Sequence, residues 1–270
     1  MGRWLSDHLL CRAEWDSVCL VDVEPSLPAL AEAAQAYAVR PTLAVPPDAG
    51  GILDGNGRPV DLSAPQTVVI LALPAAVLPN GIRRIVPLLA PDAALAVVSH
   101  GMVRALGAAH EQAPGRPAYG IHPLFDLTAR SLDGETVYLV PGADGRGHQW
   151  LVELVRAHGG TVRFGEAERH DESMAIVLAL THQSLLGLAG AVAESGLDLH
   201  EDIWAVRTPL FESLFGLAVR ALDEAQEQTI AGIQTSLDGA SAGERLDESA
   251  VRLRAALADK GSAGVQERIQ

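Results

Sequence analysis

The chain has 270 residues, of which 48% are hydrophobic and 20% are charged, and its formal net charge is −14. This length suits one large domain or two modest ones, and the composition is that of a folded globular protein. The negative charge argues against a nucleic-acid surface and against docking to anionic lipid. We find no secretory segment and no apolar run long enough to span a membrane, so we expect a cytoplasmic protein with two reduced cysteines.

The first 166 residues predict strands that alternate with helices. The expected strands are 17–23, 67–73, 94–98, a short one ending at 120–125, 136–140 and 161–164. The expected helices are 1–14, 28–39, 79–89, 101–110 and 150–158, and the stretch 43–59 is expected to be a loop. This alternation is typical of a parallel sheet covered by helices on both faces.

From about residue 166 the pattern changes, because no further strand signal appears and helical stretches run to the end. We therefore predict an α/β dinucleotide-binding domain at 1–166 and an all-helical domain at 167–270. A small, apolar helical domain often completes its core by pairing with a second copy, so we expect a homodimer. The amphipathic helix that follows residue 239 fits this role and fits a solvated, fraying helix equally well.

Four residues fall at the ends of predicted strands, where α/β sheets bind their ligands: Asp22, Pro74, Ser99 and His122. An acid at the position of Asp22 bonds the ribose hydroxyls of NAD, although an aspartate after a strand is often only a turn residue. His122 is the best general base in the chain, because an imidazole titrates near neutral pH. Taken alone, it is equally well a histidine of a surface loop.

The glycine-rich fingerprint of dinucleotide-binding folds is incomplete. Such folds begin with a strand, continue through GxGxxG and then open a helix, whereas this sequence begins within the helix. Gly2 fits the last glycine of the fingerprint, which would place the first strand and the phosphate-binding turn upstream of residue 1. The glycine-rich stretch 50–57 is no substitute, because it neither follows a strand nor opens a helix.

Two histidines, His170 and His182, flank the apolar run that opens the helical half. Their spacing in an α-helix separates them by roughly 120°, so they do not share one face. Asp171 is expected to act as a first-turn acid or cap. A histidine buried in mid-helix needs a polar partner, and the simpler interpretation is a core histidine bonded to a neighbouring helix. No spacing in the chain indicates a metal site.

The order of these motifs resembles the prephenate dehydrogenase family. The matching segments are MGRWLSDHLL, VCLVD, VVILALP, VVS, GIHPLF, HDESMA with LTH, and TPLF. They cover nearly the whole chain, and GIHPLF followed by HDESMA and LTH is a specific combination. The resemblance implies a Rossmann-like domain whose first strand is missing from this sequence, a helical dimerisation domain, and the NAD-dependent oxidative decarboxylation of prephenate to a 4-hydroxyphenylpyruvate-type product.

The resemblance also implies roles for individual residues. His122 matches the catalytic base, and Ser99 matches the serine that supports it. The residues implied in substrate binding are His182 and His170. Those implied in cofactor binding are Gly2, Asp22 and Pro74, with Asp22 indicating NAD.

Two segments depart from the family pattern. The family has Ser-Val-Lys where this chain has Ser-His-Gly at 99–101, so a cation is lost. The family's substrate-binding arginine follows a Pro-aliphatic-aromatic step, and here Glu212 occupies that position. An acid there would repel a dicarboxylate substrate by about 1 to 4 kcal/mol. Arg207 or Arg220 is expected to supply the missing charge.

These departures leave two alternatives open. One is an enzyme for an amino-substituted prephenate in a specialised pathway. The other is a non-catalytic relative that acts as a binding or regulatory protein. A dehydrogenase of the 2-hydroxyacid type would explain the sheet but neither HDESMA nor LTH.

Overall fold

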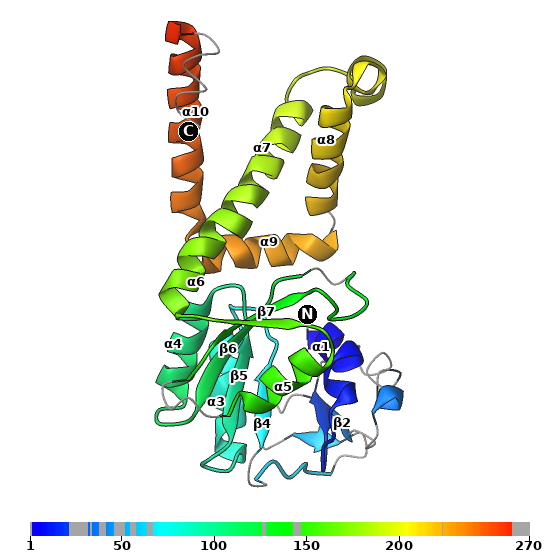
Figure 1. The fold of residues 1–270 in the computed structure, drawn as a ribbon, viewed down its shortest axis with the longest axis vertical. Helices are drawn as coiled ribbons and strands as arrows, with labels where there is room; N and C mark the ends of the chain where they lie inside the picture. Colours follow the sequence, from blue (N-terminus) through cyan, green and yellow to red (C-terminus); the bar gives the residue numbers. More distant parts are fainter. Residues whose placement is uncertain are drawn as a thin grey trace. The chain divides into compact units, whose positions relative to one another are not determined.

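The computed structural model describes residues 2–21, 32, 34–37, 42–45, 52–54, 58–63, 67–125, 128–142, 147–222 and 224–260. The chain divides into two compact units, Met1–Arg169 and His170–Gln270. We predicted this boundary after residue 166. Each unit is described by itself (Figure 1).

The first unit is built on a five-stranded sheet of order β4-β5-β6-β7-β8. Its strands are β4 (Val68–Leu71), β5 (Ala94–Val98), β6 (Ala118–Pro123), β7 (Thr136–Val140) and β8 (Thr161–Phe164). The first three strands are parallel, β7 runs antiparallel to β6, and β8 is parallel to β7. The predicted α/β class is confirmed, but the sheet is mixed. The described residues of the connection 124–135 between β6 and β7 carry no helix, whereas parallel neighbours are usually joined by a crossover helix.

A smaller three-stranded sheet contains β1 (Cys19–Val21), β2 (Thr42–Val45) and β3 (Leu53–Asp54). β1 and β2 are parallel, and β3 is antiparallel to β2. The stretch 43–59, which we predicted as a loop, therefore carries parts of two strands. Both are too short to show a clear period in the sequence. Of the predicted helix 28–39, the structure describes a 3-10 turn, η3 (Ala34–Ala36).

Helices cover both faces of the five-stranded sheet, which explains why every residue of β5 is buried. The helices are α1 (Gly2–His8) with η1 (Leu10–Arg12), α3 (Leu78–Ile85) with η4 (Val86–Leu88), α4 (Met102–Gln112) and α5 (Gln149–Ala157). On one face, Trp4 of α1 and Leu151 of α5 pack with Ala96. On the other, Ile82 of α3 and Met102 of α4 pack with Leu95. Alternate side chains of β5 thus pack into two separate hydrophobic cores, one on each face of the sheet.

The second unit is helical. Its elements are α6 (Ala167–Met174, which starts at the boundary), η5 (Ala175–Leu180), α7 (Thr181–Ala193), η6 (Leu199–Ile203), η7 (Trp204–Val206), α8 (Pro209–Ala221), α9 (Glu224–Ser236) and α10 (Gly239–Lys260). η5 and η6 have π-helical hydrogen bonding. The buried hydrophobic cluster described in this unit is small: Met174, Ala179, Ile233, Leu237 and Ala242.

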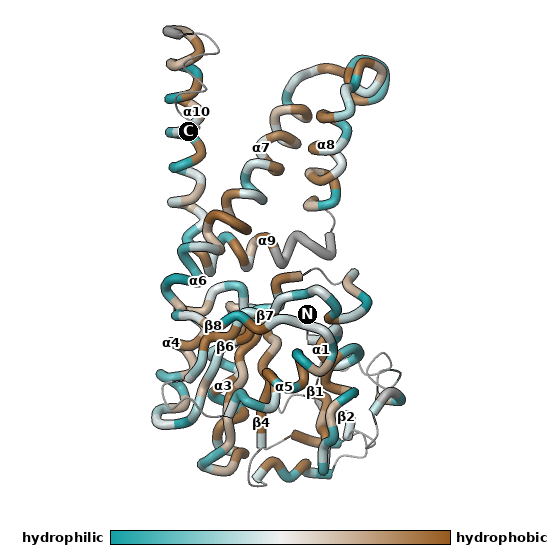
Figure 2. The backbone as a smooth tube through the Cα atoms, viewed as in Figure 1, coloured by the Kyte–Doolittle hydropathy of each residue, from teal (hydrophilic) through white to brown (hydrophobic). Residues whose placement is uncertain are grey.

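The helical unit leaves much apolar surface exposed. α7 has no fully buried residue among its 13, although it is rich in Leu, Ala and Gly. Figure 2 shows hydrophobic residues along α7 and α8. The continuous helical stretch Ala167–Ala193 has 27 residues, and its most apolar window has a mean hydropathy of 1.7 with 6% of that window buried. By length and composition it is able to cross a membrane, contrary to our sequence-based expectation, although one such helix is weak evidence of a membrane protein.

Candidate active site

The carboxyl ends of β4, β5 and β6 lie at the same edge of the sheet, because these three strands are parallel. The backbone N–H of Ser99 donates to the carbonyl of Ile121 at 3.1 Å, so the pairing of β5 with β6 continues one residue beyond β5. This pairing brings the residues that follow β5 alongside His122, near the end of β6. The edge is where a doubly wound sheet binds its ligand.

His122 is bonded to a second histidine. Its Nε2 lies 3.0 Å from Nδ1 of His100, and the two rings meet edge to face with centroids 4.9 Å apart. His122 is only 4% exposed, whereas His100 is partly exposed. One ring must donate and the other accept, so the two imidazoles share one proton across this contact. Sequence reasoning missed His100, and the available signal was a histidine placed directly after a buried strand.

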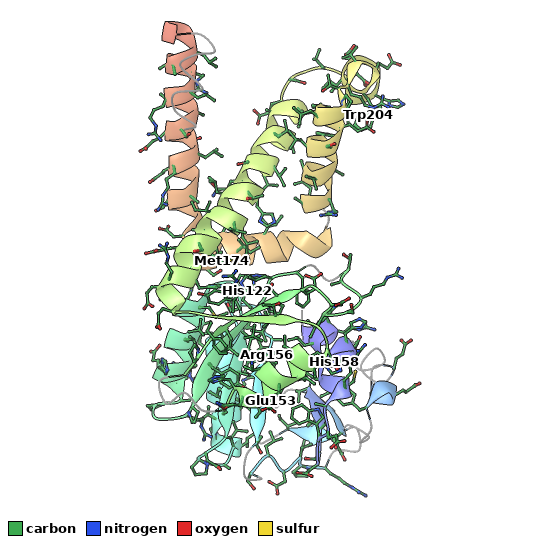
Figure 3. The ribbon with its side chains drawn as sticks, viewed as in Figure 1. His122, Glu153, Arg156, His158, Met174 and Trp204 are labelled. Carbon is green, nitrogen blue, oxygen red and sulfur yellow. The ribbon has the colours of Figure 1, made fainter. Side chains whose placement is uncertain are left out.

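The alternation of side chains along β6 places His122, labelled in Figure 3, on the face of the sheet that α4 covers. Tyr119 and Ile121 belong to the core on the α1 and α5 side. Gly120 faces the other way, and a Cβ at this position would collide with the sulfur of Met102 on α4. His122 follows Gly120 by two residues and therefore lies on the same face. Across the antiparallel pair it is matched with Tyr138 of β7.

Ser99 shapes the loop that carries His100. Its hydroxyl donates to the carbonyl of Gly101 at 3.0 Å and accepts from the N–H of Gly101 at 3.2 Å. Gly101 is the N-cap residue of α4. Ser99 therefore holds the turn between β5 and α4, and its predicted support of His122 stays a prediction.

The predicted cofactor residues gather beside β4, as far as the structure describes them. Gly2 is the first residue of α1, and a Cβ on it would lie 2.7 Å from the Cβ of Ala72, one residue after β4. Close packing of a helix on a strand is the physical role of the last glycine in the dinucleotide fingerprint. Pro74 follows two residues later. Asp22 lies outside the described residues.

In the second unit, the two predicted histidines lie on one continuous helix. His170 is buried, and its Nδ1 lies 2.8 Å from the carboxylate of Asp171. Asp171 is inside α6 rather than at its start, so it pairs with a histidine instead of capping the helix. His182 donates from Nδ1 to the backbone carbonyl of Leu178 at 2.8 Å. As far as the described residues show, it is thus bonded to its own helix and not to a neighbouring one.

The π-helical turn η5 separates these two histidines. Bonds of the π type run from residue i to i+5, so the angle expected from α-helical spacing does not apply across this segment. Such turns are frequent at functional sites. The β-branched and apolar sequence of η5 gives no signal for it.

Arg207 forms an ion pair with Glu212, with Nε 3.2 Å from the carboxylate. Its Nη1 also donates to the carbonyl of Trp204 at 2.9 Å, and its guanidinium lies 4.8 Å from the centre of the Trp204 ring. The charge that we expected to compensate for Glu212 is therefore paired with Glu212 itself. Arg220 is exposed in the last turn of α8.

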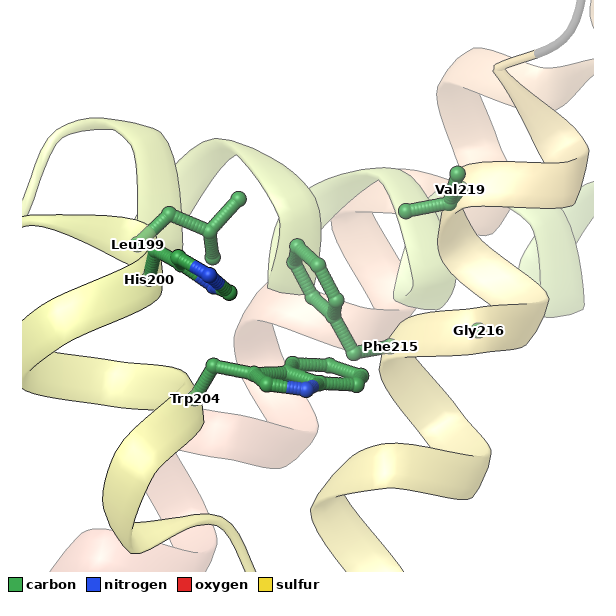
Figure 4. A pocket seen from close by; sticks show the side chains of 6 residues that line it. All are labelled: Leu199, His200, Trp204, Phe215, Gly216 and Val219. Atoms are coloured by element: carbon green, nitrogen blue, oxygen red, sulfur yellow. The ribbon is translucent and has the colours of Figure 1, made fainter.

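A cavity of about 350 Å³ lies near this pair in the helical unit (Figure 4). Its lining is mostly apolar: Leu199, His200, Trp204, Phe215, Gly216 and Val219. None of the predicted site residues lines it. Within the described part of the chain, no group of three or more His, Cys, Asp or Glu side chains is placed to hold a metal ion.

Comparison with known proteins points to one family. No protein-family profile matches the chain. A 4-amino-4-deoxyprephenate dehydrogenase from Streptomyces pristinaespiralis is 33% identical over 151 residues, which cover 56% of this chain and 51% of the relative. A T-protein from Enterobacter agglomerans is 28% identical over 117 residues, or 43% and 30% of the two chains. The chain thus matches about half or less of the length of these curated relatives.

The fold is also that of a solved enzyme. A crystal structure of prephenate dehydrogenase from A. aeolicus, in complex with hydroxyphenyl propionate and NAD+, matches with a TM-score of 0.70 at 14% identity. The match covers 100% of this chain and 92% of that one. Sequence similarity to these relatives and likeness of fold therefore agree with the motifs, and all three point to the prephenate/arogenate dehydrogenase family.

Proposed function

We propose that this protein catalyses the NAD-dependent oxidative decarboxylation of prephenate, or of a close analogue, to a 4-hydroxyphenylpyruvate-type product. The observation that carries the proposal is His122, a buried histidine at the ligand-binding edge of the sheet with a second imidazole on its ring. In a chain of this family, such a residue is suited to remove a proton from the substrate.

In this reaction His122 takes the proton from the ring hydroxyl. Loss of this proton raises the hydride-donating power of the ring carbon, and departure of carbon dioxide lets the ring become aromatic. Bound at this edge, NAD would supply the hydride acceptor. The turn that Ser99 forms with Gly101 orients the residues beside His122, and burial of the imidazole shields it from bulk water.

The described residues fit a dinucleotide at the end of β4. Gly2 allows α1 to approach Ala72 more closely than a residue with a Cβ allows. Pro74 lies at the same strand end. With Asp22 as the ribose-binding acid, we propose NAD as the cofactor.

An amino-substituted prephenate is the second candidate substrate. The curated relative from Streptomyces pristinaespiralis carries the name of an enzyme for such a compound. In addition, Glu212 stands where the family resemblance implies an arginine, and it already neutralises Arg207. A carboxylate suits a substrate that carries an amine better than one that carries only acids.

We further propose that the helical unit dimerises. Leu210 of α8 is 70% exposed, Val177 of η5 is 57% exposed, and α7 buries no residue fully. Large exposed apolar surfaces mark interaction sites, and a second copy would cover these residues. If a second copy buries the apolar helix, no membrane is needed to cover it. We therefore propose a cytoplasmic protein. Molar mass in solution, measured by light scattering, tests it: a monomeric mass would reject the proposal.

The activity is tested with purified protein, NAD and either prephenate or 4-amino-4-deoxyprephenate, following NADH and the aromatic product together. We expect both products to form in equal amounts with one of the two substrates. His122→Asn should lower kcat by about 100-fold or more, because it removes the base without removing the polar side chain. His110→Asn, an exposed histidine on α4, is the matched control and should be unaffected.

Three results would contradict this proposal or part of it. NAD binding without turnover on either substrate would indicate a changed substrate. If NAD does not bind, the chain is a non-catalytic relative with a binding or regulatory role. Full activity of His122→Asn would remove His122 from the mechanism.

A further inference from the structure

The bond between His100 and His122 is not needed by a mechanism with a single base. His122 is buried at 4% exposure, and a proton that it accepts from a substrate must leave before the next turnover. His100 lies 3.0 Å away on the loop that follows β5, and its side chain is partly exposed. The second imidazole thus stands between the buried base and solvent.

We propose that His100 is a positioning residue that holds the ring of His122 and carries its proton to solvent. This inference rests on the proposed function, since the proton comes from the substrate hydroxyl. It assigns a role to the segment Ser-His-Gly at 99–101, the place where the chain departs from the Ser-Val-Lys of its family.

The proton transfer balances without any other reactant. His122 begins with its proton on Nε2 and donates it toward Nδ1 of His100. As the hydride leaves for NAD, Nδ1 of His122 takes the hydroxyl proton and the Nε2 proton moves to Nδ1 of His100. His100 is then a cation and releases its own Nε2 proton to water. Once carbon dioxide has left and the ring is aromatic, the same path runs in reverse: water protonates Nε2 of His100, its Nδ1 proton returns to Nε2 of His122, and Nδ1 of His122 protonates the phenolate oxygen. The sum is one hydride to NAD and one carbon dioxide released, with no net proton, and both rings return to their first tautomers.

Electrostatic repulsion favours one positive charge on the pair of imidazoles over two. Two imidazolium rings in contact repel each other, so the pair binds its first extra proton as a unit and its second at lower pH. Among the titratable groups beside His122, a printed ring contact identifies His100 from the β5–α4 loop, and strand pairing identifies Tyr138 from β7.

The test distinguishes two roles of His100: holding the ring of His122 and carrying its proton. In His100→Asn, the side-chain oxygen takes the place of Nδ1, so it accepts a hydrogen bond from His122 but carries no proton onward. In His100→Ala, both functions are lost. We expect kcat to fall on the order of 10-fold or more in both variants, with little change in KM for either substrate. Added imidazole should restore kcat in His100→Ala, and His110→Asn should behave as wild type.

A second measurement needs no turnover. Histidine side chains are titrated by NMR around pH ~6.5 in the full chain. We expect His122 to titrate together with His100 in the wild type and as a single independent group in His100→Asn. Coupled titration supports the interaction between His100 and His122 even if neither substrate turns over. Absence of turnover would reject only the proposed function.

Three outcomes would overturn the inference. The first is wild-type kcat in both variants. The second is a slow His100→Ala with a fully active His100→Asn, which would show that His100 only holds the ring. The third is independent titration of the two histidines in the wild type.

Discussion

The contact between Gly2 and Ala72 makes a sharp prediction about the proposed cofactor edge. Gly2→Ala would add a Cβ 2.7 Å from the Cβ of Ala72, whereas ordinary contacts begin at 3.4 Å. Both atoms are fixed to backbone, so no rotamer relieves the clash and α1 must move away from the end of β4 by about 0.7 Å, the difference between these distances. Forcing an extra methyl group into a packed site costs about 1 to 3 kcal/mol.

This cost is measurable by thermal unfolding followed by circular dichroism. Each kcal/mol lowers the melting temperature of a domain of this size by roughly 2 to 4 °C. The displacement also moves the start of α1 relative to the sheet, so we expect weaker NAD binding, measured by quenching of tryptophan fluorescence. Trp4 in the same helix provides a local reporter.

Gly107→Ala is the matched control. Gly107 also lies in a helix, α4, but it is exposed and a Cβ there would have no neighbour within 4 Å. Removing its backbone freedom should stabilise the protein by about 0.5 to 1 kcal/mol. The two alanine substitutions are therefore expected to have opposite signs. If Gly2→Ala melts and binds NAD as the wild type does, the close approach of α1 to β4 is not maintained in solution.

Two further predictions concern the helical unit and the small sheet. Asp198 accepts hydrogen bonds from the backbone N–H groups of His200 and Glu201 at the start of η6. Asp198→Ala should destabilise the protein by about 1 kcal/mol, and an unchanged urea midpoint would show that this cap is dispensable. Burial raises the pKa of Cys19 from 9.0 to about 11, because the thiolate is desolvated. The alkylation rate of Cys19 in the folded protein should therefore keep rising with pH beyond 9.0, and a plateau near 9.0 would contradict this burial.

Several features of the fold were predictable from local pattern. The apolar run at β4, the strand at β5 and the change to helices after residue 166 all follow from hydrophobic periodicity, which depends on neighbouring residues alone. His122 was predicted at a strand end for the same reason. The structure places it there, within the last two residues of β6.

Other features depend on pairing between distant segments. The direction of β7 was not predictable, because the alternation of strands and helices does not report which way a strand runs. The strands β2 and β3 are too short to show a period, and they exist through their mutual hydrogen bonds. The π-helical turn before His182 likewise has no distinct composition.

The features of the candidate site are likewise of two kinds, those that follow from local sequence and those that depend on tertiary pairing. The sequence by itself determined that a histidine lies near the end of β6 and that Ser-His-Gly follows β5, since each position depends only on where an apolar run stops. The tertiary structure decided that His100 bonds His122, because parallel pairing of β5 with β6 brings together residues 22 positions apart. It also decided that Arg207 pairs with Glu212, since an ion pair depends on the turn between η7 and α8 and not on the presence of the two charges.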